Sequence, residues 1–124
     1  MSTQQFSKLI AGEWVAGATV TRNVNPSDTS DVVGEYAQAD AAQTTRAIEA
    51  ARAAAPAWAA FNTQARADLL EKVGLEIIAR KDELGALLSR EEGKTLPEGI
   101  GEVVRAGNVF KFFAGEVLRK SGEL

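Results

Sequence analysis

The sequence predicts a mostly α-helical chain with a small β region at its amino-terminal end. Residues 6–37 alternate short apolar runs with turn-forming residues, which is typical of short strands. From residue 40 onward the pattern changes to good helix formers, with apolar residues three and four positions apart. A repeated strand-helix-strand alternation is missing, so this length does not by itself make a complete doubly wound sheet. We therefore expect residues 1–38 to form strands and turns, and residues 39–124 to form one helical layer of a larger fold.

Three strand segments can be placed within the β region. Leu9-Ile10 and Trp14-Val15 flank the turn-forming pair Ala11-Gly12, which predicts a hairpin. A further strand, with Val32-Val33 and Tyr36, is expected after the turn at residues 25–28.

The first helix is predicted by its cap. Asp40, followed three residues later by Gln43, resembles a capping box, and residues 41–55 are good helix formers until Pro56 interrupts them. We expect the alanine-rich stretch at residues 50–60 to be closely packed and to have no function of its own. Its exit would be anchored by Trp58 and Phe61.

The later helices are also marked by their ends. Thr63 is expected to cap a second helix, Asp82 to restart the helical pattern, Gly93 to close it in a left-handed conformation, and Pro97 to lie in the first turn of a last helix. The apolar positions expected to be buried are Leu69, Leu70, Val73, Ile77 and Ile78 in the second helix, and Val103, Ala106, Phe110, Phe113 and Val117 in the last.

Composition excludes several classes of function. The net charge is -3 and there is no basic block, which argues against a nucleic-acid partner. Residues 1–20 contain neither a basic leader nor an unbroken apolar stretch, so we expect no membrane partner and a cytoplasmic protein. The chain has no Cys and no His, and therefore neither a thiol nucleophile nor the commonest general base.

Two glycine patterns suggest nucleotide binding but are incomplete. Gly93-Lys94-Thr95 resembles the end of a phosphate-binding loop, yet Leu88 stands where the loop needs a glycine. Gly99 and Gly101 begin a dinucleotide-type pattern, but Val104 stands in place of its third glycine and no strand precedes it. We interpret the first segment as a helix end and expect no cofactor to bind these 124 residues.

Arg105 is a more informative residue. It lies two residues after Val103 and five before Phe110, so it projects away from the centre of the apolar stripe. It therefore faces either water, which the residues alone favour, or a cleft formed with another part of a larger protein.

The order of short motifs along the chain resembles the opening of aldehyde dehydrogenases. Each motif alone is weak, but six of them in the correct order and spacing, from about residue 8 to residue 123, are a strong signal. In chain order they are Ile10-Ala11-Gly12-Glu13-Trp14-Val15, then Asn25-Pro26-Ser27-Asp28, then residues 47–54, then Trp58 with Arg66 and Leu69-Leu70, then Glu91-Glu92-Gly93-Lys94, and finally Phe112-Phe113-Ala114-Gly115.

The resemblance implies an α/β fold with a Rossmann-type cofactor domain, of which residues 1–124 would be the amino-terminal part. It implies an oxidoreductase that uses NAD or NADP to oxidise an aldehyde through a cysteine thiohemiacetal, and a homo-oligomer when full-length. Residues 89–102 are most similar to enzymes that act on 2-oxoglutarate semialdehyde or a related acidic semialdehyde. The family's catalytic cysteine, base and cofactor strands match no position here. We therefore expect the catalytic domain to be absent from these residues and the segment alone to be inactive.

Three residues acquire roles through the resemblance alone. Arg105 matches a position that lines the substrate tunnel, where it would bind the distal carboxylate of the aldehyde. Glu91 and the backbone carbonyl of Val24 match positions that hold a structural monovalent cation in some members. The alternative for Glu91 is a solvated helix end. The alternative for the whole chain is a self-standing helical module that binds a partner protein through apolar surface.

Overall fold

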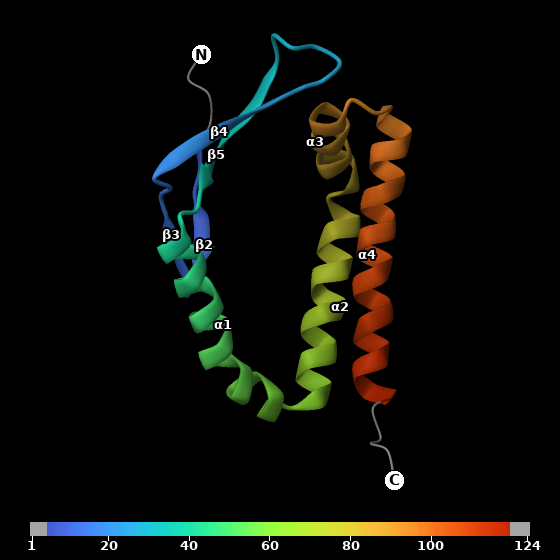
Figure 1. The fold of residues 1–124 in the computed structure, drawn as a ribbon. Coiled ribbons are helices and arrows are strands. Elements are labelled where there is room, and N and C mark those ends of the chain that lie inside the picture. The colour runs from blue at the N-terminus through green and yellow to red at the C-terminus, as the bar shows by residue number, and fades with distance from the viewer. Residues whose placement is uncertain (1–4, 120–124) are drawn as a thin grey trace. The chain divides into compact units, whose positions relative to one another are not determined.

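A computed structural model describes residues 5–119 (Figure 1). This part of the chain divides into two compact units, and the division falls between Ala60 and Phe61. The first unit holds all the described strands and one helix, and the second holds three helices. The predicted change from strands and turns to helices is thus confirmed, and each unit is described by itself.

A three-stranded sheet forms the first part of the amino-terminal unit. Its strands are β1 (Gln5–Phe6), β4 (Thr19–Val24) and β5 (Val32–Gln38), in the order β1-β5-β4. The central strand β5 pairs in parallel with β1 and antiparallel with β4. The strand at Val32-Val33 was predicted, whereas β4 was missed, although Val20 alternates with two β-branched threonines there.

One glycine lets an aromatic pair cover the sheet. Phe6 and Tyr36 stack with their ring centroids 4.9 Å apart. A Cβ atom at Gly34 would lie 2.7 Å from the Phe6 ring, so only glycine leaves room for the ring there. Aromatic rings that cover a strand glycine in this way also help to fix the pairing register.

The predicted hairpin is confirmed. β2 (Lys8–Ile10) pairs antiparallel with β3 (Glu13–Val15). Ala11 and Gly12 form the turn with φ angles of 54° and 84°. Two successive positive φ angles are the mark of the two-residue turn whose twist matches the twist of the strands.

The helix α1 (Ala41–Ala60) begins as predicted and ends later than predicted. The Gln43 backbone N–H donates to Asp40 Oδ1 at 2.7 Å, and the Asp40 N–H donates to Gln43 Oε1 at 3.4 Å, which completes the capping box. The expectation that Pro56 ends the helix was wrong, because Pro56 lies inside it. The surrounding alanines have the highest helix propensity and carry the helix across the missing donor.

The expectation of close packing in α1 was also wrong. No residue of this helix is buried, and Trp58 and Phe61 are both exposed among the described residues. Alanine therefore makes the helix here without giving it a packed core.

The second unit is built from α2 (Thr63–Ala79), α3 (Lys81–Glu92) and α4 (Leu96–Arg119). The two longer helices, α2 and α4, run side by side, and α3 packs against the first part of α4 (Figure 1). None of the described helices is long and apolar enough to cross a membrane.

The ends of these helices follow the sequence with one correction. The cap of α2 is Asn62 rather than Thr63: its side-chain oxygen accepts from the Ala65 N–H at 3.1 Å. Gly93 closes α3 in the left-handed conformation with φ 71°, and Pro97 lies in the first turn of α4, both as predicted.

The prediction of which apolar residues are buried in α2 and α4 was partly wrong. In α2 the fully buried residues are Ala67 and Gly74, whereas Leu69 and Val73 are exposed. In α4 the centre of the buried face is glycine, because a Cβ atom at Gly107 would lie 2.8 Å from the Gly74 carbonyl oxygen. The helices approach so closely along their smallest residues that larger neighbours are displaced to the flanks. The buried residues of α4 are Gly99, Val103, Gly107 and Ala114, while Ala106 and Phe113 are exposed.

Candidate functional site

The start of α4 is held by a compact set of hydrogen bonds. The backbone N–H and the hydroxyl of Thr95 donate to the same carboxylate oxygen of Glu98, at 3.1 and 2.6 Å. These bonds favour the charged carboxylate and lower the pKa of Glu98. Ser89 Oγ in α3 lies 2.9 Å from the carbonyl oxygen of Gly85 and 3.2 Å from that of Thr95, so its one hydroxyl proton is shared between the two acceptors. The position and direction of α4 are therefore fixed relative to α3.

One side of α4 packs against α2 and α3. A Cβ atom at Gly99 would lie 2.5 Å from the carbonyl oxygen of Gly85 in α3, and one at Gly107 would collide with Ile78 in α2. Both glycines face neighbouring backbones rather than an open loop. Gly99, the first glycine of the partial dinucleotide pattern, therefore lies at a helix-packing contact.

Arg105 lies on the opposite side of α4. It is two residues from both Val103 and Gly107, which are buried, and so stands about 200° around the helix from each. Its side chain is exposed, and no carboxylate among residues 5–119 pairs with it.

Apolar side chains continue this exposed face. Val109 and Phe112 follow Arg105 by one and two turns, with 49% and 61% of their surface exposed. The Phe112 ring also meets the ring of Phe113 edge-on, with centroids 5.3 Å apart. A free guanidinium at one end of an apolar strip suits a ligand that has a carboxylate at one end and a hydrocarbon stem.

A lysine between α3 and α4 organises the acidic groups near this face. Lys94 Nζ lies 2.5 Å from Glu92 Oε2 and 2.6 Å from Glu102 Oε1. The hydrogen bonds to Glu102 and Glu92 raise the pKa of Lys94 above its ordinary value. Sequence reasoning missed this pairing, because Lys94 and Glu102 are eight residues apart and Lys94 lies outside the helix that carries Glu102.

The same contacts support the helix-end interpretation of Gly93-Lys94-Thr95. The Gly93 backbone N–H donates to the carbonyl oxygen of Ser89 at 2.9 Å and closes α3. Lys94 is engaged by two carboxylates, and Thr95 by Glu98. The three residues form a corner between helices, with their polar groups bound to protein atoms.

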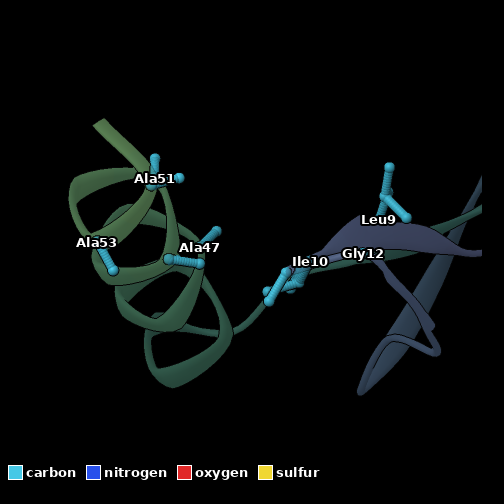
Figure 2. A pocket seen from close by; sticks show the side chains of 9 residues that line it. Leu9, Ile10, Gly12, Ala47, Ala51 and Ala53 are labelled. Carbon is cyan, nitrogen blue, oxygen red and sulfur yellow. The ribbon is translucent and has the colours of Figure 1, made fainter. Parts of the chain in front are cut away.

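An apolar hollow lies within the first unit, between the β2–β3 hairpin and α1 (Figure 2). The side chain of Ile10 points from the hairpin towards the side of α1 that carries Ala47. Leu9 and alanines of α1 line the rest, so the side chains that line the hollow offer no nucleophile, acid or base. This hollow is a packing surface rather than a candidate catalytic site.

The two proposed cation ligands belong to different units of the chain. Val24 is the last residue of β4 in the first unit, and Glu91 lies in the last turn of α3 in the second. Among the described residues no three carboxylates gather into a metal-binding group. A site made of one carboxylate and several backbone carbonyls does not need such a group.

Comparison with known proteins assigns the class. The model of the aldehyde dehydrogenase family matches residues 14–124, and the chain belongs to this family. The fold agrees: a mutant of the 1-pyrroline-5-carboxylate dehydrogenase of Thermus thermophilus superposes with a TM-score of 0.93 at 33% identity. That match covers 98% of this chain and 24% of the solved one.

Several curated relatives are semialdehyde dehydrogenases. The alpha-ketoglutaric semialdehyde dehydrogenase of Bacillus subtilis (strain 168) is 35% identical over 96% of this chain and 25% of its own length. The glutarate-semialdehyde dehydrogenase of Pseudomonas aeruginosa is 36% identical over 92% of this chain and 24% of its own. The chain thus spans about a quarter of the length of these relatives.

Proposed function

We propose that these residues are the amino-terminal portion of an NAD(P)-dependent aldehyde dehydrogenase that oxidises an acidic semialdehyde to a carboxylic acid. The observation that carries the proposal is the family match over residues 14–124. The names of the relatives support the substrate class, because both act on aldehydes that carry a carboxylate at the other end. Residues 1–124 would form the amino-terminal part of the cofactor domain, in a cytoplasmic homo-oligomer.

The chemical step requires groups beyond this segment. Oxidation through a thiohemiacetal needs a cysteine, and the 124 residues contain none. The cofactor would accept the hydride, and the glycine pattern at Gly99 and Gly101 lacks the third glycine and the preceding strand that a dinucleotide site needs. A polypeptide of these residues alone is therefore expected neither to oxidise aldehydes nor to bind a nicotinamide cofactor.

The contribution of this segment would be substrate recognition through Arg105. Its guanidinium is exposed and unpaired among the described residues, and an apolar strip follows it on α4. Two parallel N–H donors match the two oxygens of a carboxylate, so the fit is geometric as well as electrostatic. The hydrocarbon stem of the substrate would then lie along the apolar strip, with its aldehyde group towards the catalytic groups.

Steady-state kinetics of the complete enzyme tests this role. Arg105→Met should lower kcat/KM for the acidic semialdehyde by roughly one to three orders of magnitude, because losing one partner of a desolvated ion pair costs about 2 to 5 kcal/mol. A neutral aldehyde of similar length should be nearly unaffected. Equal losses for both substrates would indicate damage to α4, and no loss for either would place Arg105 in water.

A structural monovalent cation is a second proposal for the complete enzyme. Glu91 and the Val24 carbonyl would supply hard oxygen ligands, which such ions prefer, and further oxygens would come from outside the segment. The melting temperature should fall when sodium or potassium is replaced by a bulky organic cation. A melting temperature that does not change would refute this site.

A further inference from the structure

Two Glu–Arg pairs on α4 have the same spacing and different outcomes. Glu116 and Arg119 are three residues apart and form an ion pair of 3.0 Å. Glu102 and Arg105 are also three residues apart in the same order, and side chains at this spacing are neighbours on a helix. Within the described part of the chain, however, Arg105 has no ion pair.

The two pairs differ in that Lys94 contacts the carboxylate of Glu102. Its Nζ is 2.6 Å from Glu102 Oε1, so the carboxylate that Arg105 could reach is already held by a cation. Lys94 lies between the end of α3 and the start of α4, and Glu92 Oε2 holds its Nζ at 2.5 Å. Only 18% of the lysine side chain is exposed, which limits its freedom to leave.

We propose that Lys94 is a positioning residue for substrate recognition: by holding Glu102 it leaves the Arg105 guanidinium free for the carboxylate of the substrate. The inference rests on the proposed role of Arg105. Without Lys94, Glu102 would pair with Arg105 as Glu116 pairs with Arg119. It would also repel the incoming carboxylate, so competition and repulsion would act in the same direction.

The test is Lys94→Met in the complete enzyme, assayed with an acidic semialdehyde and with a neutral aldehyde of similar length. An exposed pair one turn apart and a like-charge repulsion of similar size together predict a roughly three- to fivefold loss in kcat/KM for the acidic substrate. The loss should appear mainly as a higher KM. The neutral aldehyde should be unaffected, and Lys94→Arg, which keeps the charge, should resemble the unmodified enzyme.

Removing Glu102 as well separates this role from damage to the α3–α4 corner. The double variant Lys94→Met/Glu102→Gln lacks the same lysine but no longer has the competing carboxylate, so the KM for the acidic aldehyde should recover. A structural effect of Lys94 would persist in the double variant and would overturn the proposal. In an Arg105→Met background, Lys94→Met should cause no further selective loss.

Glu102→Gln alone tests the proposal even if Lys94→Met does not fold. Because Lys94 already holds Glu102, this single change should alter the KM for the acidic aldehyde by less than about twofold. A gain of several-fold would show that Glu102 competes with the substrate despite Lys94. If Arg105→Met causes no selective loss, the role of Arg105 and this inference both fail; if only Lys94→Met is without effect, this inference alone fails.

Discussion

The two longest described helices, α1 and α4, are both rich in small residues but use them differently. In α1 alanines follow one another around every face, and no residue of this helix is buried. In α4 the small residues Gly99, Gly107 and Ala114 fall on one face with Val103, and all four are buried. Alanine thus favours a helix wherever it stands, whereas small residues, glycine included, bring two helices close together only when they face a matching partner, as Gly107 faces Gly74.

The largest expected effect comes from filling the glycine contact of α4. Gly107→Val should destabilise the fold by about 3 kcal/mol, because the new side chain collides with the Gly74 carbonyl oxygen and with Ile78. Gly101→Val is the matched control, since a Cβ atom there meets nothing within 4 Å. Chemical denaturation of the complete polypeptide measures both. Equal effects would mean that helix propensity, rather than packing, determines the cost.

A smaller effect of opposite sign is expected in α1. Pro56→Ala should stabilise this helix by about 2 kcal/mol, because alanine restores the backbone donor and removes the ring, while the unfolded chain gains some freedom. No packing loss should offset this gain, since α1 buries no residue. Amide hydrogen exchange around residues 52–60 should slow. Unchanged or faster exchange would show that the proline is needed where it is.

The smallest expected effect concerns the hydrogen bonds that begin α4. The pKa of Glu98 is lowered by its hydrogen bonds from Thr95. The folding stability that these bonds contribute is therefore fully present above the unfolded pKa of about 4.3, and it is lost as the pH falls through the lower pKa of the folded state. A carboxyl titration followed by NMR should show the depressed pKa. Thr95→Val should raise it towards its ordinary value, because the hydroxyl donor is lost. An unchanged midpoint in Thr95→Val would mean that the hydroxyl bond is not the cause.

Local chemistry made several features predictable. The capping box at Asp40, the hairpin turn at Ala11-Gly12 and the left-handed end at Gly93 each depend on residues within a few positions of one another. The missed strand β4 shows only a weak alternation of apolar and polar residues, because its first four residues are all exposed. Arg105 could be placed opposite the apolar stripe from helical spacing alone, and its exposure agrees with that placement.

What the sequence by itself determined is the change from strands to helices, several of the helix ends and the resemblance to aldehyde dehydrogenases, because these depend on short-range patterns and on the order of motifs. The tertiary structure decided which side of each helix is buried, because the close approach of two backbones at Gly74 and Gly107 depends on both helices at once. It also decided that Glu102 is held by Lys94 rather than by Arg105, since Lys94 lies outside α4 and its contact with Glu102 depends on the path of the chain before that helix.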